Sequence, residues 1–501
     1  MSKIARCFAW FFLMSRGFFV FSVAASLLLC PSPPVWSQTL ELSPCRITAG
    51  PAYPSIKARC GELLRPENPA DAGSPDITLR VVVVPALNLT PEPDPVVPIA
   101  GGPGQSTVQF YAAAEYAFEP LRRNRDILLV DQRGTGDSAP LDCELDEDVV
   151  TGGYSPELTL ELTRKCLDTL PYDPRYFTSS VAVTDLEAVR AALGYPSLNL
   201  YGVSYGTRVA QHFARRYPEV TRTIILDGVV PPQLSLGPEI ATESQKAVDR
   251  VFARCVADEA CNDRFPALAE SFADMVAALR AEPVVVSTPD PNTGRYEETE
   301  FGSDEFAAAV RLLAYHPNTI ALLPLLIHEA ANGSWVPLVS QFRMTSVSLS
   351  ESIFIGMHNA VICSEDAPFY DRAAIDLDGL AASYIGIVQL DAIETICSIW
   401  PAGPVDDEFK EPLETSAPVL LLSGDADPIT PPRYADLAAV DLDNARHLVG
   451  KTQGHGQLAV GCMPKLLEKF VAAADPDAVD AACLERAFVM PFFLDFSGPL
   501  P

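Results

Sequence analysis

The chain has 501 residues, of which 48% are hydrophobic and 20% are charged, and it contains 45 prolines. This is the composition of an ordered globular protein with many turns, and it excludes an intrinsically disordered chain. The length exceeds that of one ordinary domain, but a single catalytic unit, made of a core with an inserted subdomain, would account for it. The formal net charge of −29 argues against nucleic acid or an anionic membrane as a partner.

The first 37 residues have the organisation of a signal peptide. Three basic residues lie around apolar runs, and the last run, 18–29, is broken only by two serines. Val35 and Ser37 are small enough for a cleavage site, so we expect a mature exported chain that begins near Gln38, has a net charge of −32 and has no stable membrane association. An uncleaved anchor is one alternative, although the run is shorter than the ~20 residues that a span needs. A lipid-modified Cys30 is another, although the leucine before it is large for such a site.

The cysteines indicate disulfides. Of the twelve, ten remain after cleavage, and an even number in an exported chain favours disulfides over metal sites. Read along the chain, they form five local couples: Cys45 with Cys60, Cys143 with Cys166, Cys255 with Cys261, Cys363 with Cys397, and Cys462 with Cys483. Each closed loop would add about 2 to 4 kcal/mol of stability.

Short apolar runs bounded by glycine or proline predict the first strands, at 77–85, 96–99 and 127–130. Runs this short and β-branched favour buried parallel strands over helices. Further along, the spacing predicts a helix over 181–193, a strand over 198–201, a helix over 207–217 and a strand over 223–228. Strand and helix alternate, so the fold class is α/β with a mostly parallel sheet.

The pattern changes after residue 230. Helical stretches such as 243–257 and 306–314 dominate, and no alternation of strand and helix is evident. The sheet resumes with strands at 419–424 and 446–449, followed by a closing helix at 464–473. The predicted organisation is therefore a signal peptide over 1–37, a catalytic core in two parts over 38–230 and 412–501, and an inserted helical cap over 231–411.

The sequence Gly-Val-Ser-Tyr-Gly around Ser204 is the candidate site of a nucleophile. A serine hydroxyl attacks only when a base removes its proton, and it must be presented at an exposed position. Gly202 and Gly206 permit a sharp turn between a strand and a helix, which holds the serine in a strained and exposed conformation. The alternative is a glycine-rich turn in a binding fold.

Two aspartates at the end of a strand, Asp425 and Asp427, compete for the role of the acid. We prefer Asp427, which lies beyond the strand end and next to a proline. The candidate base is His455, which two glycines flank after the last strand, whereas His447 lies within that strand and is interpreted as a packed residue. The order Ser204, Asp427, His455 is the order of the α/β-hydrolase triad.

The oxyanion that forms during attack needs hydrogen-bond donors. The backbone N–H of Tyr205, at the helix start, is one candidate, and Gly102 in the loop 101–104 is the second, with a simple Pro-Gly turn as the alternative. We interpret Asp131 and Arg133 as structural residues, and we expect Arg133 to pair with carboxylates that fix the loops around the site. No HExxH, P-loop or dinucleotide motif occurs, so we expect no metal and no nucleotide cofactor.

Several segments resemble the prolyl and tripeptidyl aminopeptidase branch of the α/β hydrolases. They are 101–104, 131–138, 202–207, 422–431 and 454–456. The resemblance covers about 76–230 and 400–485, and it implies an α/β-hydrolase fold and an exported serine exopeptidase that acts on peptides. Ala100 departs from the pattern, because many prolyl aminopeptidases have a histidine there, and this disfavours a strict prolyl iminopeptidase.

The resemblance also implies that acidic residues of the cap bind the free ammonium of the substrate. Glu365, with Asp366 as its neighbour, is the best-placed acidic pair here, and the alternative is an acidic surface loop near a disulfide. For the whole chain, an esterase or lipase on the same fold is the first rival interpretation, because a fold does not determine a substrate. A catalytically silent binding member of the fold is the second.

Overall fold

The computed structural model describes residues 40–143, 154–290, 293–350 and 352–498. The chain divides into two units, Met1–Ser37 and Gln38–Pro501, and the description below concerns the second. The predicted signal peptide and its cleavage site lie outside the described residues, and the predicted domain boundaries stay predictions. Among the helices of the described part, none has an apolar stretch of the length that crossing a bilayer requires.

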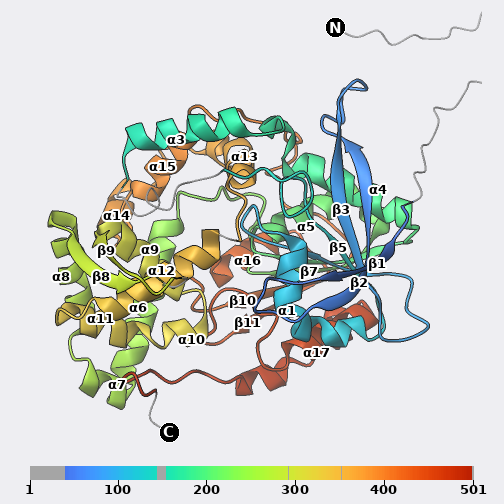
Figure 1. Cartoon of the computed structure of the whole chain (residues 1–501). Helices are drawn as coiled ribbons and strands as arrows, with labels where there is room; N and C mark the ends of the chain where they lie inside the picture. The colour runs from blue at the N-terminus through green and yellow to red at the C-terminus, as the bar shows by residue number, and fades with distance from the viewer. Residues whose placement is uncertain (1–39, 144–153, 291–292, 351, 499–501) are drawn as a thin grey trace, which may run out of the picture. The chain divides into compact units, whose positions relative to one another are not determined.

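A nine-stranded sheet forms the centre of this unit, in the order β1-β2-β3-β5-β4-β6-β7-β10-β11 (Figure 1). From β5 to β11 all neighbouring strands run parallel, as the sequence predicts for a mostly parallel sheet. These strands are β4 (Val96–Ile99), β5 (Ile127–Val130), β6 (Leu198–Val203), β7 (Thr221–Asp227), β10 (Val419–Gly424) and β11 (Ala445–Gly450).

The other edge of the sheet is antiparallel. β1 (Ser43–Ile47) pairs with β2 (Ile56–Pro66), β2 pairs with β3 (Asp76–Val84), and β3 pairs antiparallel with β5. The prediction of a parallel strand at 77–85 is therefore wrong in direction. The loop 85–95 connects β3 to β4 without a crossover helix, and a parallel arrangement of the two strands would require such a crossover.

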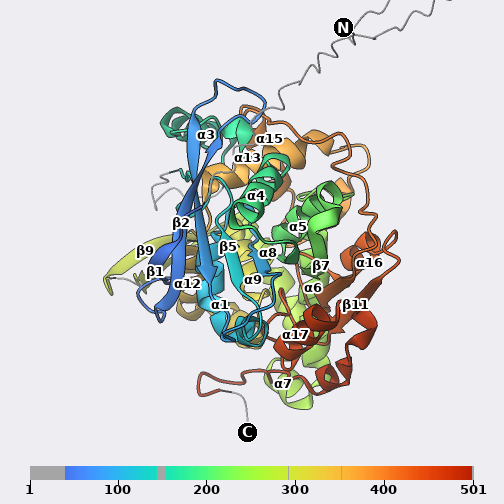
Figure 2. The same cartoon turned by 90° about the vertical axis from the view of Figure 1, so that its right-hand side faces the viewer.

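Successive residues of the strands face opposite sides of the sheet, and helices cover both sides. In β10, Leu421 packs toward α4 and α5, whereas Leu420 and Leu422 pack toward α1 and α17. Because both faces are buried, the strands are continuous apolar runs rather than alternating ones. The helices, seen from the side in Figure 2, are α1 (Thr107–Arg122), α4 (Ser179–Leu193), α5 (Tyr205–Arg216) and α17 (Met463–Ala473).

Between β7 and β10 the chain is mainly helical and has a hydrophobic core of its own; we call residues 231–411 the cap segment. Aromatic rings fill that core, with Phe272 in contact with Phe252, Phe306 and Tyr384. A two-stranded hairpin, β8 (Val284–Pro289) with β9 (Tyr296–Phe301), lies in it and was not predicted from the sequence. The helices are α6 (Ile240–Ala257), α7 (Glu259–Arg264), α8 (Leu268–Ala281), α9 (Ser303–Leu313), α10 (Pro317–Ile320), α11 (Leu323–Ala331), α12 (Val336–Ser350), α13 (Ile355–Glu365), α14 (Leu377–Ala382) and α15 (Val388–Cys397).

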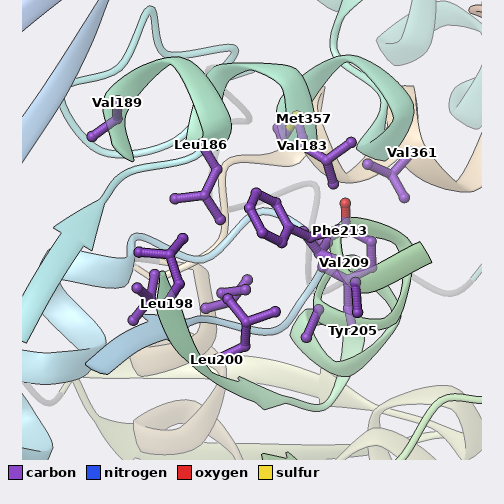
Figure 3. Packing of buried hydrophobic residues seen from close by; sticks show 14 of the residues in the cluster. Val183, Leu186, Val189, Leu198, Leu200, Tyr205, Val209, Phe213, Met357 and Val361 are labelled. Carbon is purple, nitrogen blue, oxygen red and sulfur yellow. The ribbon is translucent and has the colours of Figure 1, made fainter. Parts of the chain in front are cut away.

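One helix of the cap segment, α13, packs directly on the helices beside the sheet. Figure 3 shows Met357 and Val361 of α13 next to Val183 of α4 and Phe213 of α5. All four side chains are fully buried in the same cluster. This packing fixes α13 relative to α5, the helix that begins immediately after Ser204.

All five predicted disulfide couples are present in the structure. Cys45–Cys60 links β1 to β2, and Cys363–Cys397 links α13 to α15. The antiparallel edge of the sheet and the cap segment thus each contain an internal disulfide.

Candidate active site

Ser204 lies at the junction of β6 and α5, with backbone angles φ 55° and ψ −127°. A positive φ is costly for a residue with a Cβ and is kept only where the surroundings impose it. Here the backbone N–H of Ser204 donates to the carbonyl of Asp227 at 2.9 Å, which ties the turn to β7. The serine side chain is only half-buried, so it is presented at the carboxyl end of the sheet.

The glycines around Ser204 are required by close packing of the backbone. A Cβ on Gly206 would lie 2.1 Å from the carbonyl oxygen of Ile99, and a Cβ on Gly202 would lie 2.4 Å from that of Gly206. Neither backbone oxygen belongs to a flexible side chain that could move away. The turn therefore forms only with glycine at both positions.

The structure brings His455 and Asp427 together. Nδ1 of His455 lies 2.8 Å from Oδ2 of Asp427, which is fully buried. The other carboxylate oxygen accepts the backbone N–H groups of Ile429 and Thr430, at 2.8 and 2.9 Å, and the Thr430 hydroxyl donates to Oδ2 at 2.7 Å. Asp425, the competing candidate, instead accepts the N–H of Thr452.

The electrostatics of the pair favour a charged acid and a basic imidazole. Burial disfavours the charged form of His455, but the charge and hydrogen bond of Asp427 outweigh it and raise the pKa of the imidazole above its ordinary value. Burial also opposes ionisation of Asp427, yet His455 and the N–H donors lower the pKa of its carboxyl. A histidine with a raised pKa is a stronger base for the proton of a hydroxyl.

Asp227, at the end of β7, connects the serine turn with the histidine loop. Its backbone carbonyl binds Ser204, and its carboxylate accepts the N–H groups of Gln457 and Leu458 at 2.7 to 2.9 Å and the hydroxyl of Tyr201 at 2.7 Å. Burial raises the pKa of this carboxyl to about 6. Sequence reasoning missed it, although an aspartate directly after the apolar run 224–226 was a usable signal.

The loop with the second candidate oxyanion donor lies against the serine. A Cβ on Gly101 would be 2.9 Å from Cβ of Ser204, and the next residue, Gly102, has φ 104°. Tyr205 is the first residue of α5, where backbone N–H groups have no partner within the helix. Both candidates are thus adjacent to Ser204, and their role as donors stays a prediction.

Glu365 and Asp366 lie at the C-terminal end of α13 and are both fully buried. Asp366 accepts two hydrogen bonds from the guanidinium of Arg208, at 2.8 and 2.9 Å, and one from the N–H of Leu236. Glu365 accepts the N–H and the hydroxyl of Ser179, at 2.6 and 2.9 Å. Both carboxylates therefore already have donors from within the chain.

The same two carboxylates differ in charge balance. Lys410 Nζ lies 3.5 Å from Asp366, so that carboxylate has two cations beside it. Burial raises the pKa of Glu365 to about 7, against the opposing effect of Arg208, whose nearest nitrogen is 3.9 Å away. With a pKa of about 7, the Glu365 carboxyl is only partly ionised at neutral pH.

The cap segment contacts the histidine loop through Tyr315, which follows α9. Its carbonyl oxygen accepts the N–H of His455 at 2.7 Å, and its ring meets the imidazole edge-on with 5.2 Å between the ring centres. A Cβ on Gly454 would lie 2.2 Å from the same carbonyl oxygen. The cap segment thus helps to hold His455, the candidate base, and no feature of the local sequence had indicated this.

Two further interpretations of charged residues agree with the structure. Arg133 is fully buried and donates to both oxygens of Asp185, at 2.7 and 2.9 Å, and to the carbonyls of Glu67 and Tyr176, which is the predicted structural role. His447 packs in β11 with Asp436 and Ser423 as its partners. Within the ranges that the structure describes, no group of three or more His, Cys, Asp or Glu side chains has the geometry of a metal site.

Comparisons with known proteins agree with this geometry. A family model described as the alpha/beta hydrolase fold matches residues 94–285, and one described as TAP-like protein matches residues 382–483. The chain is 26% identical over 449 residues to the serine protease Hip1 of Mycobacterium tuberculosis strain H37Rv, a match that covers 82% of this chain and 83% of Hip1.

Two other relatives match shorter stretches. The putative hydrolase YuaR of Escherichia coli K12 is 29% identical over 287 residues, which cover 54% of this chain and 57% of YuaR. The tripeptidyl aminopeptidase of Streptomyces coelicolor is 29% identical over 168 residues, 29% of this chain and 31% of that enzyme. The chain thus matches little more than half the length of YuaR and a third of the aminopeptidase.

Proposed function

Because this chain belongs to the α/β hydrolases, in their TAP-like branch, we propose that it is a serine exopeptidase that releases short fragments or single residues from the N-terminus of peptides. The observation that carries the proposal is the 2.8 Å contact of Asp427 with His455, on a histidine loop that Asp227 ties to the strained turn of Ser204. The names of the relatives Hip1 and tripeptidyl aminopeptidase support a peptide rather than another acyl substrate.

In the proposed reaction, Ser204 Oγ attacks the scissile carbonyl carbon while its proton passes to Nε2 of His455. Asp427 keeps the Nδ1 proton in place and stabilises the imidazolium. The backbone N–H groups of Tyr205 and Gly102 stabilise the oxyanion of the tetrahedral intermediate. His455 then gives its proton to the leaving amine, the C–N bond breaks, and water hydrolyses the ester on Ser204 by the same sequence.

A profile of cleavage tests this function. Peptides of graded length, each with a free and an acetylated N-terminus, are assayed beside short acyl esters. The proposal expects cleavage near free N-termini and loss of cleavage after acetylation. Equal cleavage of acetylated peptides would contradict the exopeptidase assignment, and turnover of esters alone would make the enzyme an esterase.

Recognition of the substrate ammonium by Glu365, with Asp366 beside it, is part of the proposal. The bonds that Ser179 makes to Glu365 would have to rearrange for an ammonium to bind there. Replacing Glu365 with Gln should raise KM for substrates with a free amine and spare an N-acylated ester. An equal loss on both substrates would refute the role.

We also propose export by a cleaved signal peptide over 1–37. Five disulfides in the structure support an oxidising compartment, where such bonds persist. N-terminal sequencing of the protein recovered from outside the cytoplasm should give a start near Gln38. A start at Met1 would contradict it.

A further inference from the structure

Helix α9 carries an arginine, Arg311, for which no carboxylate partner occurs among the described residues. Its side chain is partly buried, and its Nε is fully buried without a hydrogen-bond partner in that same part of the chain. The one hydrogen bond that its side chain makes among the described residues joins Nη2 to the hydroxyl of Tyr315 at 3.4 Å, which is long. A cation withdrawn from water without a counter-ion is unfavourable, so this site suits an anion from outside the chain.

Two other arginines of the cap segment have acidic partners, and two more donate to backbone carbonyls, Arg264 to that of Leu494 and Arg280 to that of Ser383. Arg343 lies 2.6 Å from a carboxylate oxygen of Glu297, and Arg372 lies 2.8 Å from Glu394 and 3.5 Å from Asp391. The chain also has a large excess of acidic residues, 65 against 36 basic ones. Arg311 differs from these four arginines, because its Nε is fully buried without a partner and its guanidinium has neither a carboxylate nor a carbonyl acceptor among the described residues.

Arg311 is connected to the candidate base, His455, through Tyr315. It reaches Tyr315, whose ring and carbonyl oxygen both contact His455. The positive charge of Arg311 opposes the rise in the pKa of His455, and it adds to burial in lowering the pKa of His358. Nδ1 of His358 in turn lies 3.2 Å from the carbonyl oxygen of Pro103, in the loop that contains Gly102.

The side of the site on which Arg311 lies indicates what it binds. His455 protonates the leaving amine, so a group beside His455 meets the part of the peptide that follows the scissile bond. A guanidinium binds carboxylates with two parallel N–H donors. We propose that Arg311 binds a carboxylate on the first residue after the scissile bond and so selects short peptides whose C-terminus lies there; this rests on the proposed peptidase function.

That carboxylate has two sources, the C-terminal group of the released residue or an acidic side chain at the same position. Three peptides with the same N-terminal part distinguish them: one that ends in alanine with a free carboxylate, one that ends in alaninamide, and one that ends in aspartyl amide. With the wild-type chain, kcat/KM for the free acid should exceed that for the alaninamide about tenfold or more. If the aspartyl amide matches the free acid, the side chain is an equal source.

Arg311→Gln should bring the ratio of acid to alaninamide close to one, and Arg311→Lys, which keeps the charge but loses the planar fork, should give an intermediate ratio. Arg372→Gln is the matched control, since it removes a cap arginine with its own carboxylate partners, and it should keep the wild-type ratio. The ratio separates a binding role from a merely structural one, because a loosened fold lowers kcat/KM for both peptides alike.

Two results would overturn the inference and are distinct from failure of the proposed function. They are equal cleavage of the acid and the alaninamide by the wild type, and an unchanged ratio in both Arg311 variants. Hydrolysis of a neutral acyl ester without cleavage of any of the three peptides would overturn the proposed peptidase function, and with it the peptide carboxylate.

Discussion

The carboxylates at the strand ends and those at the end of α13 connect different parts of the molecule. Asp227 and Asp427 each accept two backbone N–H groups of the loops around the candidate triad. Asp366 depends on the side chain of Arg208, 158 residues away in sequence, and Glu365 depends on Ser179, 186 residues away. The strand-end carboxylates thus hold the loops around the candidate triad, whereas the carboxylates of α13 join the cap segment to α4 and α5, by hydrogen bonds from Ser179 and an ion pair with Arg208.

The difference suggests separate tasks for the two regions. Backbone donors hold an acid and a base in one geometry, as catalysis of a single reaction requires. Side-chain pairs in the cap segment fix helices, and beside them Arg311 is left with a charge that a substrate can satisfy. Variants in the two regions should therefore differ, with catalytic losses on the sheet side and losses of stability or selectivity on the cap side.

The largest expected effect is that of Asp427→Asn on catalysis. The amide can still accept the N–H groups of Ile429 and Thr430, so folding should survive, but it holds the imidazole in the wrong tautomer. We expect kcat to fall about 10⁴-fold. Asp425→Asn is the matched control, with little change in steady-state kinetics, and equal losses in the two variants would break the assignment of the acid.

The next effect is on stability and lies on the cap side. Asp366→Asn removes the counter-charge that is hydrogen-bonded to the fully buried Arg208 and leaves only Glu365, 3.9 Å away, so it should cost about 3 to 5 kcal/mol in urea unfolding. Asp406→Asn removes a carboxylate whose side chain is 41% exposed and should cost about 1 kcal/mol or less. If both variants lose the same free energy, the long-range pair does not anchor the cap segment.

A smaller effect is expected at the residue that joins the two loops of the site. Asp227→Asn removes one acceptor oxygen from a carboxylate with three donors, so one donor is left unpaired, at a cost of about 1 to 3 kcal/mol. The displaced loops should lower kcat more than they raise KM. Asp436→Asn, which alters an exposed partner of His447, is the control. A change in KM alone at Asp227 would contradict the positioning role.

The smallest effect is a shift in pH dependence. The pKa of His455 is raised above its ordinary value of about 6.5, and the base must be neutral to act. As the pH falls through that raised pKa, kcat/KM should fall, so the acid limb should lie above pH ~6.5. Titration of the histidine ring in Asp427→Asn should give a lower pKa. An unchanged pKa would mean that Asp427 does not act on the base.

A structural feature is predictable from the sequence when the residues that determine it are neighbours in the chain, and it is missed when they are far apart. The strands, the disulfide couples and the serine turn rest on patterns of a few neighbouring residues, and the structure has them. The direction of β3 was mispredicted because an apolar run is the same in a parallel and an antiparallel strand. The hairpin of β8 and β9 was missed because its strands are half-exposed and lie among helices.

Within the site, the same limit applies. The roles of Asp227 and Tyr315 arise from contacts with a loop 140 to 230 residues further along the chain, which no local motif records. Glu365 and Asp366 were expected at the substrate, and only tertiary structure shows Ser179 and Arg208 bound to them. Arg311 was not singled out, because the sequence of a helix does not show which side chains surround an arginine in the folded chain.

The central claim, that Ser204 is a nucleophile activated by His455, is tested most directly by mass spectrometry of the protein after reaction with a fluorophosphonate. We predict a single adduct on the peptide that contains Ser204, no adduct in Ser204→Ala, and much slower labelling in His455→Ala. An adduct on another serine, or peptide cleavage that persists in Ser204→Ala, would contradict the account.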